Sequence, residues 1–500
     1  MARRGDGASL LALHLDPAAA APLFRQLYDA LRLALLGGRL APGARLPSSR
    51  LLARELGISR NTVLLALDQL LSEGYIIGRG GSGTFVSRDL PERSPRQGRR
   101  PPPSVVAAPE LSRRGLAFAD RPGAGPPGTG ARPPPPAGPF APGVPDCRDF
   151  PFEPFARLLG HAWRHPQPAL FRRQDPAGQM PLRAAIADYL KSARGVRCKP
   201  EQVFIVSGSR QAIDLATRLL IDPGDGVWIE EPGYPGNRDA LAAGGARLLA
   251  VPVDEEGLDV QAGERAGPAR LACVTPSHQY PLGATMSLGR RLSLLAWARA
   301  TGAWIIEDDF DSEFRYAGRP LAALQGLDED GRVVYLGSFS KVLFPSLRLG
   351  YLVVPAPLLE PFRRARAVLD DYPSALAQPA LAAFLADGSF AAHVRRMRRR
   401  YALRQQALLA AARRHLGGLL TLAPDPAGMH IVADLAPALA LRMDDREAAA
   451  RAAAAGIGAP ALSFYYLGKP ARQGLLLGYA ALNEAEIEQH VRRLAAALAP

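Results

Sequence analysis

One lysine directly follows a segment with the composition of a buried strand. The chain contains four lysines, and Lys341 ends the segment SFSK at 338–341, with Ser338 and Ser340 beside it. A lysine amine at the end of a strand can form a Schiff base with an aldehyde cofactor. Lys341 is therefore the candidate for covalent chemistry, because the other three lysines lie at predicted loops or turns: Lys191, Lys199 and Lys469.

Two further segments have the composition of an anion-binding site. Arg348 lies in FPSLRLGY (344–351), and a guanidinium can hold a phosphate through two parallel hydrogen bonds. The segment SGSRQA (207–212) joins a predicted strand to a predicted helix, and its small residues would present backbone amides at the helix N-terminus. The alternatives are an arginine whose stem lies along the protein surface and an ordinary strand-to-helix turn.

A dense acidic cluster, EDDFDSEFRY (307–316), ends another predicted buried strand. A carboxylate in that position could hold the ring nitrogen of a pyridine cofactor and make the ring an electron sink. A solvated acidic loop is one alternative. A metal site built from Asp308, Asp309 and Asp311 is another, although no histidine is adjacent in the sequence.

These groups must be positioned by a sheet. Short segments rich in Val and Ile alternate with helical patterns such as 287–302, which predicts a largely parallel sheet with helices on both faces. Ligands of such sheets bind at the carboxyl ends of the strands, where the phosphate cradle, the carboxylate and the lysine would meet. A helical lobe is expected over roughly 390–500. The predicted strands are 203–208, 226–231, 270–276, 303–309, 332–340 and 349–354.

The N-terminal part has the pattern of a helix-turn-helix with a wing. Apolar residues share one helical face over 22–40, shorter helices are expected at 48–56 and 60–73 around Gly57, and a glycine-rich hairpin follows at 75–86. The second helix of such a motif lies in the major groove of DNA. The alternative is a three-helix packing module with a solvated arginine face. The candidate DNA contacts are Arg45, Ser48, Ser49, Arg50, Ser59, Arg60, Asn61, Thr62 and Arg79.

Composition limits the remaining possibilities. The 500 residues carry a net charge of +14, which favours a polyanion partner or reflects a bias toward arginine. Three cysteines without metal or disulfide spacing indicate a reducing cytoplasm, and no apolar segment is long enough to span a membrane. Residues 89–145 contain 16 prolines and 8 glycines and are predicted to be a poorly ordered linker. The expected domains are therefore 1–88, 89–145 and 146–500.

Two family resemblances extend these interpretations. The segment LPSSRLLARELGISRNTVLLALDQLLSEGYIIGRGGSGTFV (46–86) resembles the winged-helix domain of GntR-type transcription regulators. Residues 146–500 resemble the fold-type-I aminotransferases, which use pyridoxal 5′-phosphate (PLP). The order of winged helix, linker and aminotransferase-like α/β domain resembles the MocR subfamily of GntR regulators. The aminotransferase-like motifs are DPAGQMPLRAAIADYL (175–190), EEPGYPG (230–236), TPSHQYPLG (275–283), EDDFDSEFRY (307–316) and SFSKVLFPSLRLGY (338–351).

The resemblance implies a role for each site residue. Lys341 would form the Schiff base with PLP, Asp308 would pair with the pyridine nitrogen, and Tyr234 would stack on the ring. His278 or Gln279 would approach the ring 3′-oxygen, and which of the two does so stays open. The phosphate would be held by Arg348, Ser338, Ser340 and the amides of Ser209 and Arg210.

Two departures from the family pattern bear on the effector. Family members often have a tyrosine that contacts the cofactor at the position of Phe310. Relatives that bind amino acids place an arginine in a strand near the C-terminus, where LLLGYA (475–480) puts Leu476, although Arg472 could substitute. A leucine cannot pair with a carboxylate, so we expect PLP itself to be the effector, as in the regulators called PdxR.

The resulting expectation is a cytoplasmic, homodimeric regulator that binds operator DNA and PLP and controls genes related to vitamin B6. The alternatives are a regulator that responds to an amino compound through PLP, an active PLP-dependent aminotransferase with an accessory DNA-binding domain, and a DNA-binding protein that has lost its cofactor.

Overall fold

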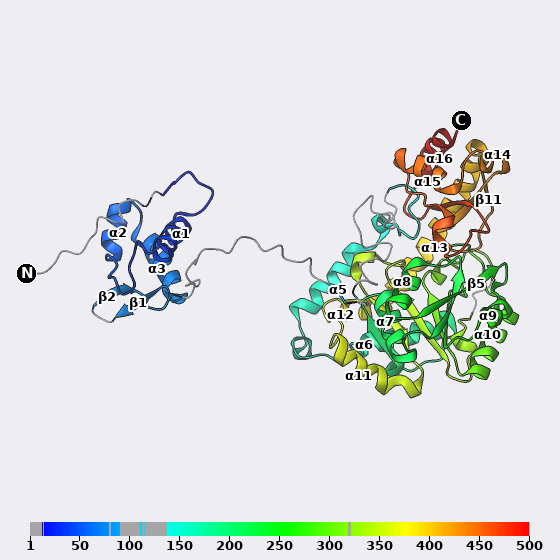
Figure 1. Cartoon of the computed structure of the whole chain (residues 1–500), viewed down its shortest axis with the longest axis horizontal. Coiled ribbons are helices and arrows are strands. Elements are labelled where there is room, and N and C mark those ends of the chain that lie inside the picture. The colour runs from blue at the N-terminus through cyan, green and yellow to red at the C-terminus, as the bar shows by residue number, and fades with distance from the viewer. Residues whose placement is uncertain are drawn as a thin grey trace, which may run out of the picture. The chain divides into compact units, whose positions relative to one another are not determined.

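The chain divides into two compact units, Met1–Glu110 and Leu111–Pro500, each described here by itself (Figure 1). The computed structural model describes residues 13, 15–79, 82–90, 111, 112, 115, 138–318 and 322–499. Most of the predicted linker, including its proline runs at 101–103 and 133–136, lies outside the described residues, as do Gly80 and Gly81 of the predicted wing.

The N-terminal unit has the predicted winged-helix arrangement. Helices α1 (Leu23–Leu36), α2 (Ser49–Leu56) and α3 (Arg60–Ser72) precede an antiparallel hairpin of β1 (Ile76–Arg79) and β2 (Gly83–Val86). Ser48 and Ser59 begin α2 and α3 by accepting hydrogen bonds from the amides of Leu51 and Thr62, which satisfies free helix donors. Gly57 ends α2 in the left-handed conformation at φ 65°.

Apolar residues at helical spacing form the core of this unit. Leu27, Leu31 and Leu35 of α1 pack with Val63 and Leu70 of α3, and all five side chains are at most 1% exposed. This core fixes α3 against α1 and leaves the N-terminal end of α3 at the surface.

An eight-stranded sheet forms the centre of the C-terminal unit, with the strand order β3-β10-β9-β8-β7-β4-β5-β6. Its middle is parallel, as predicted, whereas β10 runs antiparallel between β3 and β9, and β6 runs antiparallel to β5. The strands β5 and β6 were not predicted. The bounds are β3 Val203–Val206, β4 Gly226–Glu231, β5 Arg247–Asp254, β6 Gly257–Leu258, β7 Leu271–Val274, β8 Trp304–Asp309, β9 Val333–Ser338 and β10 Gly350–Val353.

Helices cover both faces of this sheet, as the alternation of buried residues along its strands requires. One face packs against α7 (Ser209–Leu220), α8 (Pro235–Ala243) and α11 (Leu359–Leu369). The other packs against α6 (Met180–Arg194), α12 (Gln378–Ala386), α9 (Val260–Ala266) and α10 (Leu288–Thr301). On that face, the rings of Trp228 and Trp297 stack 3.9 Å apart.

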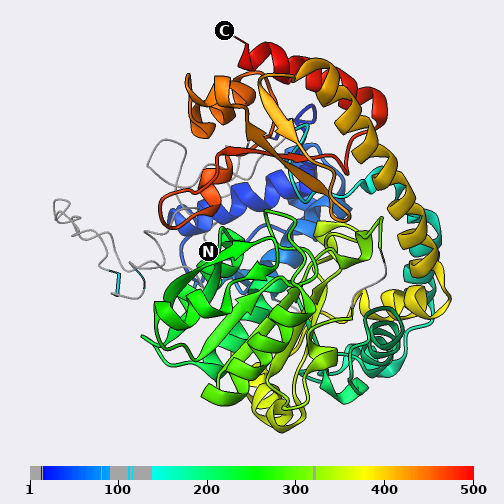
Figure 2. The ribbon, with the colours of Figure 1, turned by 90° about the vertical axis from the view of Figure 1, so that its right-hand side faces the viewer.

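The C-terminal lobe is not purely helical, which corrects the prediction for 390–500. The long helix α13 (Ser389–His415) runs from the sheet region to this lobe (Figure 2), which contains a three-stranded antiparallel sheet. Its strands are short and lie in a stretch rich in Ala and Leu, where helical periodicity masks them. The lobe contains β11 Leu420–Leu422, β12 His430–Leu435, β13 Gly474–Gly478, α14 Pro437–Ala440, α15 Asp445–Ala454 and α16 Glu484–Leu498.

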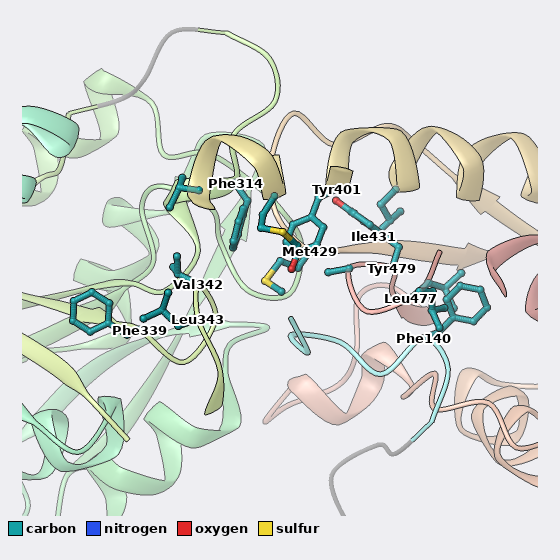
Figure 3. Close-up of a cluster of buried hydrophobic side chains, with 14 of the residues drawn as sticks. Phe140, Phe314, Phe339, Val342, Leu343, Tyr401, Met429, Ile431, Leu477 and Tyr479 are labelled. Atoms are coloured by element: carbon teal, nitrogen blue, oxygen red, sulfur yellow. The ribbon is translucent and has the colours of Figure 1, made fainter. Parts of the chain in front are cut away.

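The C-terminal unit begins before residue 146, the boundary predicted from composition. The Gly458 amide donates to the Pro139 carbonyl at 2.8 Å, and the Gly478 amide donates to the Phe140 carbonyl at 2.9 Å. Phe140 is 1% exposed and lies next to Leu477 in the buried cluster of Figure 3. Helix α5 (Phe152–Arg164) follows this segment. Within the described residues, no helix is long and apolar enough to cross a membrane.

Candidate cofactor and DNA-binding sites

Asp308 and Lys341 come from neighbouring parallel strands, as the sequence predicts. Asp308 lies near the carboxyl end of β8, and Lys341 follows β9 by three residues. The register pairs Asp308 with Leu336 and Asp309 with Gly337, so the chain reaches Lys341 just beyond the edge at which β8 ends.

The Asp308 carboxylate is buried, and only one of its two oxygens has a hydrogen-bond partner among the described residues. Its Oδ2 accepts a hydrogen bond of 2.7 Å from Nδ2 of Asn237, whereas its Oδ1 and the Oδ1 of Asn237 lack a partner among the described residues. Burial raises the pKa of Asp308 to about 6, although the Asn237 hydrogen bond opposes this shift. Buried polar atoms are normally satisfied, so these oxygens fit a ligand that supplies a ring N–H and a hydroxyl.

The neighbouring acids have different partners. Asp309 Oδ2 accepts from Nε of Arg194 at 2.8 Å and from the Tyr335 hydroxyl. Asp311 pairs with Nδ1 of His278 at 3.0 Å. Because the three carboxylates bind separate groups, they do not converge as a metal site would require. Among the described residues, no group of three or more His, Cys, Asp or Glu side chains is arranged to hold a metal ion.

The Lys341 amine faces a carbonyl of the segment that leads into this unit. Its Nζ donates to the Gly143 oxygen at 2.7 Å. Burial lowers the pKa of Lys341, while the negative charges of Asp311 and Asp308 oppose that shift. A lowered pKa increases the neutral fraction of the amine, which is the nucleophilic form.

Arg348 lies beside the start of α7, where the sequence predicts a phosphate site. Gly208, at φ 139°, is the N-cap of α7, and a Cβ on it would lie 3.4 Å from the Arg348 guanidinium. The first amides of α7, including those of Ser209 and Arg210, have no partner within the helix and point out of its N-terminus. Ser340 donates its amide to the Ser338 hydroxyl at 3.2 Å in the loop after β9. A pocket opens beside Ser207 and Arg348.

A cluster of aromatic residues around Tyr280 forms a wall of the site, here called the aromatic wall. Tyr234 precedes α8 and packs edge-on against Tyr280, with ring centroids 5.4 Å apart. Tyr234, Asn237 and Tyr465 line a common pocket. Phe310, at the position where family members often have tyrosine, packs against Tyr280 at 5.8 Å.

His278 and Gln279 are both engaged by protein groups. His278 pairs with Asp311 and, through Nε2, with Asp425 at 3.3 Å. Burial lowers the pKa of His278, but the two carboxylates outweigh it and raise the pKa to about 10. Gln279 donates to the carbonyls of Pro232 and Tyr280 and accepts from the amide of Leu282. Asn237, which we did not predict, carries the unsatisfied oxygen expected of a partner for a ring hydroxyl.

Leu476 faces this aromatic wall. Along β13, Leu475 and Leu477 point into the main core, whereas Leu476 packs with Tyr280 and Tyr465. Arg472, the possible substitute for a carboxylate-binding arginine, pairs with Asp434 at 2.8 Å on the surface.

The predicted DNA contacts lie at the starts of α2 and α3, in the segment before α2 and on the hairpin. Arg50, Arg60 and Asn61 are exposed, whereas the Ser48 and Ser59 hydroxyls are occupied as helix caps. Ser49 accepts from Nε of Arg60 at 3.3 Å, which links the starts of α2 and α3. At the wing, Arg45 lies against Gly83 and Arg79 lies over the Phe85 ring. At the start of α3, the Thr62 hydroxyl is hydrogen-bonded to the Ser59 hydroxyl.

Comparisons with known proteins agree with both units. The family of bacterial regulatory proteins called gntR matches residues 23–86, and aminotransferase class I and II matches residues 155–494. The chain is 43% identical to the probable rhizopine catabolism regulatory protein MocR of Rhizobium meliloti, over 97% of this chain and 95% of that protein. It is 34% identical to the pyridoxine biosynthesis transcriptional regulator PdxR of Corynebacterium glutamicum, over 95% of each.

A solved structure has the same fold as the C-terminal unit. The α-aminoadipate aminotransferase of Thermus thermophilus, complexed with N-(5′-phosphopyridoxyl)-L-leucine, is 31% identical, with a TM-score of 0.65 over 72% of this chain and 91% of its own. A winged helix of the gntR type and a fold-type-I aminotransferase domain thus occur in one chain, which belongs to the MocR subfamily of GntR-type transcription regulators.

Proposed function

We propose that this protein is a DNA-binding transcription regulator that holds PLP at Lys341 and responds to PLP itself. The observation that carries this proposal is the pair of unsatisfied buried oxygens on Asp308 and Asn237, at the edge of the sheet where Lys341 follows β9. The Thermus relative, which was solved with a phosphopyridoxyl compound, supports the choice of ligand.

Different residues of the chain would bind different parts of PLP. PLP, when bound, supplies an aldehyde carbon open to an amine and a pyridine ring that withdraws electrons. Asp308 would accept a hydrogen bond from the ring nitrogen, Asn237 would hold the ring hydroxyl, and Tyr234 would cover the ring. Arg348 and the N-terminus of α7 would hold the phosphate, because both present donors to a dianion.

The aromatic wall that Leu476 faces supports PLP, rather than an amino acid, as the effector. An amino acid brings a carboxylate, and burying an unpaired carboxylate against Leu476, Tyr280 and Tyr465 would carry a large desolvation cost. The name of PdxR refers to pyridoxine biosynthesis, which supports control of genes related to vitamin B6. MocR is named for rhizopine catabolism rather than for vitamin B6, so a different effector is also possible in this family, and an amino compound acting through PLP is the second candidate.

The winged helix would bind operator DNA with α3 in the major groove. Arg60 and Asn61 would meet base edges, while Arg45, Arg50 and Arg79 would contact phosphates. A homodimer would present two such units to paired half-sites.

The test is DNA binding measured by fluorescence anisotropy at one stated salt concentration, using duplexes from upstream of the gene and its neighbours. We expect PLP to change the Kd of the wild-type protein at least about fivefold, the lower end of typical coupling between two sites. The Lys341→Ala variant should not respond, whereas Lys199→Ala, on the surface, should respond as wild type does. Equal Kd values with and without PLP would refute PLP as the effector.

A turnover assay separates the regulator from the aminotransferase alternative. Amino acids with a keto acid should give no sustained turnover, because Leu476 offers no charge for the substrate carboxylate. Rapid multiple turnover would contradict the proposed function and restore the enzyme interpretation.

A further inference from the structure

The segment 138–146, here called the strap, carries the chain from the predicted linker into the C-terminal unit. Hydrogen bonds anchor it at both ends. Gly458 and Gly478 donate to the carbonyls of Pro139 and Phe140 at one end. At the other, the Asp146 amide donates to the Tyr401 hydroxyl at 3.0 Å, and its carboxylate pairs with Arg404 at 2.8 Å. Figure 3 shows the Phe140 ring inserted beside Leu477 in the core.

The middle of the strap contacts the Lys341 amine. The Gly143 carbonyl accepts the only hydrogen bond that Nζ of Lys341 makes within the described residues, at 2.7 Å. Gly143 has φ +71°, and a Cβ at this position would lie 2.7 Å from Nζ. The backbone conformation at this position favours glycine, and a Cβ here would push the Lys341 amine aside.

The contact cannot survive unchanged when the amine reacts with an aldehyde. The neutral amine attacks the aldehyde carbon, a C=N bond replaces C=O, and the oxygen leaves as water with the two amine hydrogens. No oxidant or reductant is needed. The nitrogen then has no hydrogen to donate, or a single one if the imine is protonated, and its new carbon partner fixes its direction.

We propose that the strap responds to the state of Lys341: the free amine holds Gly143, and engagement of the amine by PLP releases the middle of the strap. This inference rests on the proposed function, since it assumes that PLP reacts with Lys341. The inference names the strap as the segment that responds to PLP. In the sequence, the strap directly follows the linker that joins this unit to the DNA-binding unit.

Hydrogen exchange of the full-length protein, followed by mass spectrometry, tests the proposal. We expect PLP to speed exchange in peptides covering 138–147 by roughly tenfold, the effect of losing one hydrogen bond to a charged group. Peptides from α16 should not change. Absorbance of the same sample near the visible band of PLP imines reports binding independently.

Variants without PLP test the strap directly. Lys341→Met keeps the side-chain stem but cannot donate, so its strap should exchange as fast as that of PLP-treated wild type, and PLP should cause no further change. Lys341→Ala provides the same test with a different side chain. Lys199→Ala is the matched control and should behave as wild type does. Gly143→Ala should also loosen the strap, because its Cβ would displace the amine.

The outcomes separate the two proposals. If PLP develops its imine absorbance and the strap exchanges at an unchanged rate, the strap inference is wrong while the proposed function stands. If Lys341→Met and Lys341→Ala both leave strap exchange at the wild-type rate, the inference is wrong whatever PLP does. If no absorbance develops while both variants loosen the strap, PLP does not react with Lys341 and the proposed function is wrong. The hydrogen bond between Lys341 and Gly143 would then still hold the strap, but the strap would have no role in sensing PLP.

Discussion

Replacing Arg348 by alanine should weaken PLP binding while leaving the fold intact. The Arg348 guanidinium lies against Gly208, where the amides of α7 open, and its side chain is exposed. Hydrogen bonds to charged groups contribute about 1.5–3 kcal/mol, and exposure to water places this one at the lower end. With tenfold in Kd for each 1.4 kcal/mol, we expect Arg348→Ala to raise the Kd for PLP ~10- to 30-fold.

The assay is titration with PLP followed by absorbance, and Arg210→Ala is the matched control. Arg210 lies next to the same helix start and is also exposed, but its predicted contribution is its backbone amide, which alanine retains. Its Kd should change less than about threefold. The reasoning would be refuted if Arg348→Ala bound PLP as wild type does, or if both variants lost affinity equally, because the effect would then come from general positive charge.

Three further predictions concern DNA, the buried carboxylate and the core. Arg60→Ala should weaken operator binding by about 1–3 kcal/mol in anisotropy titrations, whereas Arg25→Ala on α1 should have little effect; similar losses would argue against α3 as the reading helix. The pKa of Asp308 is raised from 3.8 to about 6, so without PLP its contribution to stability falls as pH rises from about 4 to 6. Asp308→Asn should therefore stabilise the PLP-free protein at pH 8 by ~3 kcal/mol at most, while weakening PLP binding. Urea unfolding at pH 4.5 and pH 8 measures this, and the same change in the free energy of unfolding between the two pH values in both proteins would contradict it. Leu70→Ala should destabilise the N-terminal unit by ~2–5 kcal/mol, and a loss below 1 kcal/mol would contradict the described core.

Strongly patterned elements could be predicted from the sequence. The helices of the N-terminal unit and the Val- and Ile-rich strands of the large sheet match the prediction, because their periodicity is reinforced by Gly57, serine caps and glycine turns. Strand β5 was missed because it contains a proline and has several exposed positions, so it lacks the continuous apolar character of a buried strand.

The positions of candidate site residues could be predicted where one local segment defines them. Lys341, Asp308 and Arg348 each follow or flank a recognisable strand. Asn237 and Gly143 were missed because their roles depend on packing between distant parts of the chain: 71 residues separate Asn237 from Asp308, and 198 separate Gly143 from Lys341. The proline and glycine content around Gly143 also made it resemble linker.

Lys341 and Arg348, the arginine proposed to bind the phosphate, share one hairpin. Strands β9 and β10 pair antiparallel, with Ser338 opposite Gly350, and the eleven-residue connection between them contains both Lys341 and Arg348. Inserting or deleting a residue in this connection would change the spacing between the two residues proposed to hold opposite ends of PLP, whereas changes in most surface loops would not. This loop should therefore tolerate substitutions better than changes of length, a rule that a library of loop-length variants could test.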